Sequence, residues 1–159
     1  MLLGGVFKAT GNTSPVMIAA KGRWLLADLA RWAARYGVPL KLPTDFPINT
    51  LTLMRGAAGM QLKQPQDFQR YLTTVFESIF AQGLAMGDST VVSRVLSDAG
   101  FDAAEFLALT GDPTVKQALI ENTDEAVARG AFGAPTMFVG KEMHFGQDRL
   151  DFVAAALRG

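Results

Sequence analysis

A chain of 159 residues with 15 basic and 15 acidic side chains has no net charge, so neither nucleic acid nor a charged membrane surface is an expected partner. Its apolar fraction of 49% suits one soluble domain with a sizeable core, and no apolar run is long enough to span a membrane. The absence of cysteine excludes disulfides, thiolate metal sites and a CxxC redox pair, and a single histidine excludes a histidine-rich metal site. Since the N-terminus has no signal-peptide pattern, we expect a cytoplasmic protein without a metal site.

The first elements expected are the end of a strand and a long amphipathic helix. Leu2–Phe7 is a short apolar run that predicts the end of a strand. Between residues 17 and 36 apolar side chains recur every three or four positions, which predicts a helix that ends at Gly37. Its two tryptophans, Trp24 and Trp32, are interpreted as core or dimer contacts.

Five more helices are predicted from their caps and breakers. A side-chain oxygen before a helix accepts a hydrogen bond from a free backbone N–H, and a proline in the first turn costs no hydrogen bond. The predicted helices are residues 49–61 with Asn49 as cap, Pro65 to Gln82, a helix capped by Asp88-Ser89-Thr90 that ends at Gly100, Asp102 to Leu109, and a helix from Asp112-Pro113 to Gly130.

The segment 131–149 is predicted to form a loop, two short strands with a tight turn, and the start of a last helix at about 147–157. Pro135 cannot donate a ladder hydrogen bond, so it opens the strand or lies on its edge, and the backbone of Ala134 is left to pair with an extended molecule. The helix that begins at Gln147-Asp148 directs free N–H groups to the same side. This pattern predicts a peptide-like, anionic ligand.

Three motifs, in this order, resemble one known family. They are Leu2–Asn12, the run Lys21-Gly22-Arg23 before the first long helix, and Gly130–Thr136 followed by Phe145–Asp151. They are similar to 2-hydroxychromene-2-carboxylate isomerases and kappa-class glutathione transferases, which belong to the DsbA-like group with a thioredoxin fold.

The resemblance implies an α/β, thioredoxin-like fold with a large all-helical insertion. Residues 1–13 and 131–159 would form the thioredoxin-like layer, and residues 14–130 would form the insertion. Residues 2–12 would be the family's second strand and the loop after it. The family's first strand and helix, with the serine or cysteine that faces the glutathione sulfur, would then be missing, so no catalytic residue is assigned.

The resemblance also implies a glutathione site around residues 131–149. The Ala134-Pro135 bond would be cis, as thioredoxin-like folds have it, and the backbone of Ala134 would pair with the cysteinyl part of glutathione. Gln147 and Asp148 would hold the γ-glutamyl end, while Arg149 is expected to be solvated or ion-paired. Read from the residues alone, the same positions are a structural turn and a helix cap.

Further contacts are implied outside that segment. Asn12 and Lys21 correspond to glutathione-contacting positions, and Lys21 would face the glycyl carboxylate. Lys8, Asn49 and Arg55 are weaker candidates for an aromatic carboxylate substrate. By composition these are solvated loop residues, and Asn49 is explained as a helix cap.

The function that the resemblance favours is that of a glutathione-dependent isomerase of the 2-hydroxychromene-2-carboxylate type, which acts in aromatic degradation as a homodimer. Its partners would be glutathione and a small aromatic carboxylate. One alternative is a kappa-type glutathione transferase or a DsbA-like thiol-disulfide oxidoreductase. A second alternative is not an enzyme: a truncated, dimerising helical remnant. Without the serine or cysteine turn, the sequence leaves open whether the chain is an enzyme.

Overall fold

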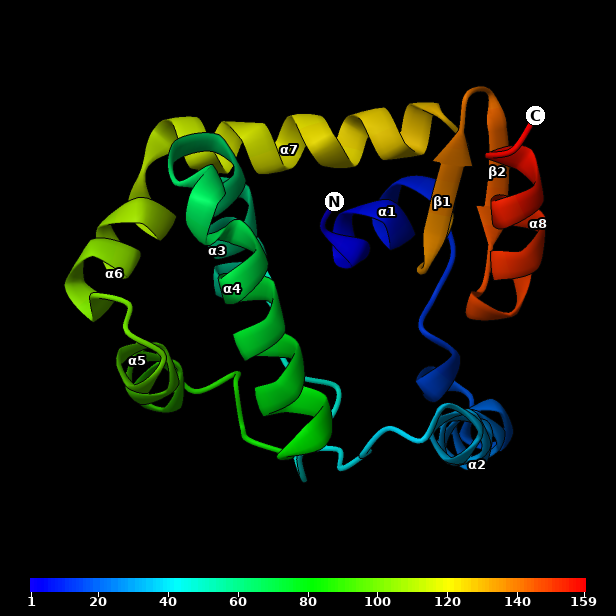
Figure 1. Cartoon of the computed structure of the whole chain (residues 1–159), viewed down its shortest axis with the longest axis horizontal. Coiled ribbons are helices and arrows are strands. Elements are labelled where there is room, and N and C mark those ends of the chain that lie inside the picture. The colour runs from blue at the N-terminus through cyan, green and yellow to red at the C-terminus, as the bar shows by residue number, and fades with distance from the viewer. The chain divides into compact units, whose positions relative to one another are not determined.

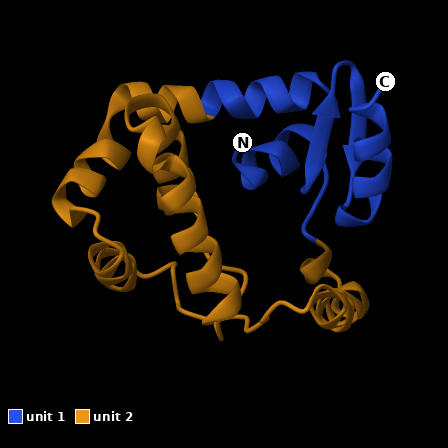
Figure 2. Cartoon of the chain, viewed as in Figure 1, with its two compact units in different colours: residues 1–14, 120–159 blue, residues 15–119 orange.

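The computed structural model describes residues 1–159, which form two compact units (Figure 2). Unit 1 comprises residues 1–14 and 120–159, and unit 2 comprises residues 15–119. The helices are α1 (Leu3–Thr10), η1 (Pro15–Met17), α2 (Ala19–Tyr36), α3 (Leu51–Lys63), α4 (Pro65–Phe76), η2 (Glu77–Ala81), α5 (Ser89–Asp98), α6 (Ala103–Gly111), α7 (Pro113–Ala128), η3 (Gln147–Arg149) and α8 (Leu150–Ala156), and the strands are β1 (Thr136–Val139) and β2 (Glu142–Phe145). The division into a layer of 1–13 with 131–159 and an insertion of 14–130 stays a prediction. None of the helices combines the length and the apolar character that crossing a membrane requires.

The strand predicted at Leu2–Phe7 is wrong, because Leu2 precedes helix α1 and the residues from Leu3 to Phe7 belong to it (Figure 1). A short apolar run fits a buried strand and a buried helix equally well. The helix pairs its backbone internally, and the backbone N–H of Leu2 donates to the hydroxyl oxygen of Thr123 on α7 over 2.8 Å. The side chain of Val6 is fully buried. The segment 2–12 is therefore a helix and a loop in unit 1.

The two short strands predicted after Pro135 form an antiparallel hairpin in unit 1. Thr136 faces Phe145 and Val139 faces Glu142, so two residues make the turn. Gly140, the first of them, has a φ of 57°, a backbone angle that glycine adopts without steric cost. Helix α8 packs against β1 (Figure 1), which covers one side of the hairpin.

Unit 2 has its core around the ring of Tyr71, which is buried. The Tyr71 hydroxyl donates to the backbone oxygen of Leu53 over 2.8 Å, and the ring stacks on Phe106 with centroids 5.8 Å apart. A Cβ atom on Gly56 would lie 2.8 Å from the Tyr71 ring carbon Cζ, so this glycine lets α3 approach α4 closely. Burial raises the pKa of the Tyr71 hydroxyl, which therefore stays protonated as a donor.

The three predicted aspartate caps are confirmed. Asp88 accepts from the N–H of Thr90, Asp102 caps the first turn of α6, and Asp112 caps the first turn of α7. Asn49 was predicted as the cap of α3; the cap position is Thr50, and the Asn49 side chain, one residue earlier, accepts from the N–H of Leu51. These local contacts set where the helices begin.

The helix predicted for residues 17–36 corresponds to α2, which begins at Ala19, two residues later than predicted, and has Gly37 in the left-handed conformation at its end. No residue of α2 is buried, and Trp24 is 61% exposed. Trp32 packs on Tyr36 and under the guanidinium of Arg35. Trp24 is therefore not a core residue of this chain, and its role as a dimer contact stays a prediction.

Candidate functional site

In the loop before β1, the backbone of Ala134 forms no hydrogen bond within the protein. The Ala134–Pro135 bond is cis, as expected, and both residues are exposed. Ala134 takes part in none of the hydrogen bonds of the loop. Next to it, the Thr136 hydroxyl donates to the Gly133 oxygen over 2.8 Å, and the Gly146 N–H donates to the Pro135 oxygen over 3.0 Å. The Ala134 backbone is thus free while both flanks are held in place.

A second segment of the chain is fixed against this loop by Asn12. Its side-chain nitrogen donates to the backbone oxygen of Phe132 over 2.8 Å, and its side-chain oxygen accepts from the N–H of Thr13 over 2.8 Å. One N–H of the Asn12 amide remains without a partner in the protein. Lys8, in the last turn of α1, is exposed and makes no ion pair.

The third segment is the turn that follows β2. Gln147 and Asp148 lie in η3, directly after Gly146, which is hydrogen-bonded to Pro135. The carboxylate of Asp148 pairs with the guanidinium of Arg149 over 2.8 Å, and about half of each side chain is exposed. The expectation that Arg149 is solvated or ion-paired is confirmed. Two hydrogen bonds therefore join the three segments that carry Asn12, Ala134 and Asp148.

The other candidates lie in unit 2. Lys21 is exposed in the first turn of α2. The side-chain oxygen of Asn49 accepts from the N–H of Leu51, the first residue of α3. Arg55, on α3, is half-buried and makes no ion pair. The structure brings Asn12, the Ala134–Pro135 bond and residues 147–148 into one unit, and Lys21, Asn49 and Arg55 belong to the other.

Sequence reasoning did not find the aromatic pair that supports the loop. The rings of Phe132 and Phe145 lie with centroids 4.5 Å apart, and a Cβ atom on Gly133 would lie 2.9 Å from the Phe145 ring. Phe145 sits at the end of β2 and Phe132 precedes the loop, so no local pattern signals their contact. The pair packs the loop against the end of the hairpin.

Arg129 is a second residue that the sequence did not single out. Its guanidinium lies 3.8 Å from the centroid of the Phe138 ring and donates to the Gly140 oxygen over 3.2 Å. It also lies 3.5 Å from the carboxylate of Glu125, one turn earlier on α7. These contacts hold the end of α7 to the hairpin that carries the site.

The single histidine lies in β2, and its imidazole is mostly buried. The Nε2 atom of His144 has no hydrogen-bond partner and lies 3.8 Å from the nearest Glu142 oxygen. No three acidic, histidine or cysteine side chains lie together as metal ligands would. The polar groups near Ala134 that the structure brings together are backbone groups, the side-chain amides of Asn12 and Gln147, and the paired side chains of Asp148 and Arg149.

Comparisons with known proteins agree on one family. A model of the DSBA-like thioredoxin domain matches residues 1–158. A 2-hydroxychromene-2-carboxylate isomerase from Sphingobium xenophagum is 30% identical over 151 residues, which are 94% of this chain and 75% of that protein. Glutathione S-transferase kappa 2 from Caenorhabditis elegans is 31% identical over 172 residues, with 98% of this chain and 76% of that protein covered.

A solved structure shows that the similarity extends to the fold. The structure of a 2-hydroxychromene-2-carboxylate isomerase superposes with a TM-score of 0.82 at 30% sequence identity. The match covers 98% of this chain and 76% of that one. This chain spans about three quarters of the length of these relatives.

Proposed function

This chain belongs to the DsbA-like thioredoxin family, and we propose that it binds glutathione at the Ala134 loop of unit 1 and serves a glutathione-dependent isomerase reaction. The family assignment also gives its fold, which is thioredoxin-like. The observation that carries the proposal is the free backbone of Ala134 between two hydrogen-bonded flanks. An extended peptide can pair with such a backbone as an added strand does.

The residues around Ala134 fit the chemistry of glutathione. Its cysteinyl peptide groups match the Ala134 N–H and C=O. Its γ-glutamyl ammonium matches the half-exposed carboxylate of Asp148, and the side-chain amide of Gln147 lies beside it in η3. Asn12 has one amide N–H left to donate. Lys21, in unit 2, keeps the role toward the glycyl carboxylate that the family resemblance implies.

In this reaction, the chain's own residues would bind glutathione and the substrate and orient them. When bound, glutathione supplies a nucleophilic sulfur that can add reversibly to an unsaturated carbon of the substrate. Pairing at Ala134 would fix the cysteinyl backbone and thereby the direction of its side chain. Lys8, Asn49 and Arg55 are proposed to attract the carboxylate of the aromatic substrate. No residue of the chain is assigned to activate the sulfur.

Calorimetric titration with reduced glutathione tests the binding step. We expect saturable binding at millimolar ligand or below. We expect S-methylglutathione to bind about as well, because the proposed contacts are to the peptide and not to the thiol. Cysteinylglycine lacks the γ-glutamyl group and should bind more weakly. No heat with millimolar glutathione would overturn the proposal.

A kappa-type transferase is the second candidate, since a relative with that name is 31% identical to this chain, against 30% for the isomerase. Both reactions would use the same glutathione site. Incubation with glutathione and 2-hydroxychromene-2-carboxylate distinguishes them, because an isomerase leaves the glutathione concentration unchanged and a transferase consumes it. Binding without either reaction would favour the non-enzymatic alternative.

A further inference from the structure

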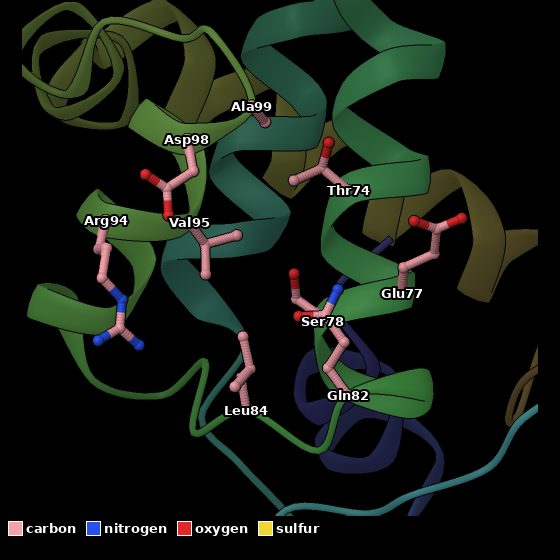
Figure 3. A pocket seen from close by; sticks show the side chains of 9 residues that line it. All are labelled: Thr74, Glu77, Ser78, Gln82, Leu84, Arg94, Val95, Asp98 and Ala99. Atoms are coloured by element: carbon pink, nitrogen blue, oxygen red, sulfur yellow. The ribbon is translucent and has the colours of Figure 1, made fainter.

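Unit 2 contains a cavity of about 460 Å³ that the proposed glutathione site does not use (Figure 3). It lies between the C-terminal part of α4 with η2 on one side and α5 on the other. Its volume falls in the range of roughly 300–1,000 Å³ in which proteins hold small molecules.

A wide turn of helix forms one wall of the cavity. In η2 the N–H of Gln82 donates to the Glu77 oxygen, five residues earlier, over 2.9 Å. The N–H of Leu84 then donates to the Ser78 oxygen over 2.9 Å. Such π-helical turns are rare and occur frequently at functional sites. This turn holds Glu77, Ser78, Gln82 and Leu84 at the cavity.

The hydroxyl of Ser78 is the observation that points to a ligand. Only 3% of the Ser78 surface is exposed, and no hydrogen bond of the structure involves its hydroxyl. Figure 3 shows this side chain in the gap between η2 and α5. Because the hydroxyl oxygen itself is not fully enclosed, water or a polar group of a bound molecule in the cavity can be its partner.

Charges of both signs surround the same space without pairing to each other. Arg94 and Asp98 project from α5, and Glu77 lies on η2 with its carboxylate directed away from α5 (Figure 3). None of the three takes part in an ion pair. Leu84 and Val95 give the cavity an apolar part between them. The lining therefore offers one cation, the carboxylate of Asp98 and an aliphatic surface.

We propose that this cavity binds a free aliphatic α-amino acid. Its carboxylate would accept from the Arg94 guanidinium, which is suited to a carboxylate by its two parallel donors. Its ammonium would donate to Asp98, and the Ser78 hydroxyl would donate to the carboxylate as well. The aliphatic side chain would lie on the apolar part of the lining. None of the residues that line this cavity is among those proposed to contact glutathione or the aromatic substrate.

Titration of the full chain with L-leucine, followed by amide chemical shifts, tests the proposal. The amides of Ser78 and Arg94 should shift with saturation at millimolar ligand. N-acetyl-L-leucine has no ammonium and L-leucinamide has no carboxylate, so each should bind about tenfold more weakly. No saturable shift with L-leucine, or equal binding of the three compounds, would overturn the proposal.

Three variants locate the binding. Ser78→Ala should weaken L-leucine binding about fivefold and Arg94→Gln about tenfold, as loss of one hydrogen bond and of one charged contact predicts. Ser97→Ala is the matched control, because Ser97 is an exposed serine of α5 outside the cavity, and it should bind as the unmodified chain does. Circular dichroism checks that each variant is folded. Folded Ser78→Ala and Arg94→Gln variants with unchanged affinity would place the ligand elsewhere and refute the assignment.

Discussion

The side-chain amide of Asn12 donates to the backbone oxygen of Phe132 over 2.8 Å, although 120 residues separate them in the chain. Because Phe132 lies two residues before Ala134, this hydrogen bond holds the loop after α1 against the loop that carries the open peptide. Asn12 was predicted as a ligand contact, and the structure also gives it a structural role. A substitution of Asn12 should therefore be measured for its effect on stability as well as on binding.

Replacing Asn12 by alanine should lower the free energy of unfolding by about 1 kcal/mol, because two exposed hydrogen bonds are lost. Asn12→Asp keeps an acceptor for the Thr13 N–H but removes the donor to Phe132, so it should be destabilised too. Urea denaturation measures both variants. Asn122→Ala, at an exposed position of α7, is the control and should change little. If the Asn12→Asp variant is as stable as the unmodified chain, the hydrogen bond to Phe132 does not contribute to stability.

Replacing Asp148 by alanine should weaken glutathione binding by about 1–3 kcal/mol, because a charge-assisted contact to the γ-glutamyl ammonium is lost. Calorimetric titration measures the change. Asp151→Ala is the control, because Asp151 is an exposed carboxylate in the first turn of α8. An equal loss in both variants would point to a general effect of negative charge and against a contact by Asp148.

Two glycine-to-alanine substitutions in helices should change the stability of the protein in opposite directions. At Gly4, on α1, no atom lies within 4 Å of the new Cβ, so alanine should stabilise by about 0.4–1 kcal/mol. At Gly56, on α3, the new Cβ would lie 2.8 Å from the Tyr71 ring, so alanine should destabilise by about 1–3 kcal/mol. Thermal unfolding compares the two. A stabilising Gly56→Ala change would mean that α3 and α4 do not pack as described.

The stability of unit 2 should depend on pH through Asp112. The side chain of Lys63 and the N–H of Thr114 lower the pKa of Asp112 from 3.8 to about 2. Since the folded pKa is the lower one, the stabilisation is fully present above pH 3.8 and is lost as the pH falls towards 2. Lys63→Met should raise the pKa of the Asp112 carboxyl. The pKa is measured from the chemical shift of the Asp112 carboxyl carbon as a function of pH. Lys141→Met, in the hairpin turn, should leave it unchanged.

Local signals in the sequence predicted much of the helical structure. The aspartates that begin α5, α6 and α7 could be predicted because a cap contacts only the next two or three residues. The strand prediction for the apolar run 2–7 was wrong for the opposite reason. The residue on α7 that it contacts, Thr123, lies far along the chain. The widened turn at 77–81 was predicted as ordinary helix, because no residue type there marks it.

The sequence indicated which segments carry the candidate site, but it did not indicate the contacts between these segments. The cis bond before Pro135 and the positions of Gln147 and Asp148 followed from the resemblance to a family. The hydrogen bond from Asn12 to Phe132 and the ring contact between Phe132 and Phe145 did not, because they depend on how distant segments meet.

The contact of Leu2 with Thr123 has a consequence for synthesis on the ribosome. Their positions are 121 apart, so at 5–20 residues per second α1 waits on the order of ten seconds for its partner helix. During that time the side chain of Val6, fully buried in the finished protein, has no native surface to cover it. Residues 15–119 are complete before that surface exists. Helix α1 therefore leaves the ribosome before α2 to α7 but reaches its native contacts only after α7 has emerged.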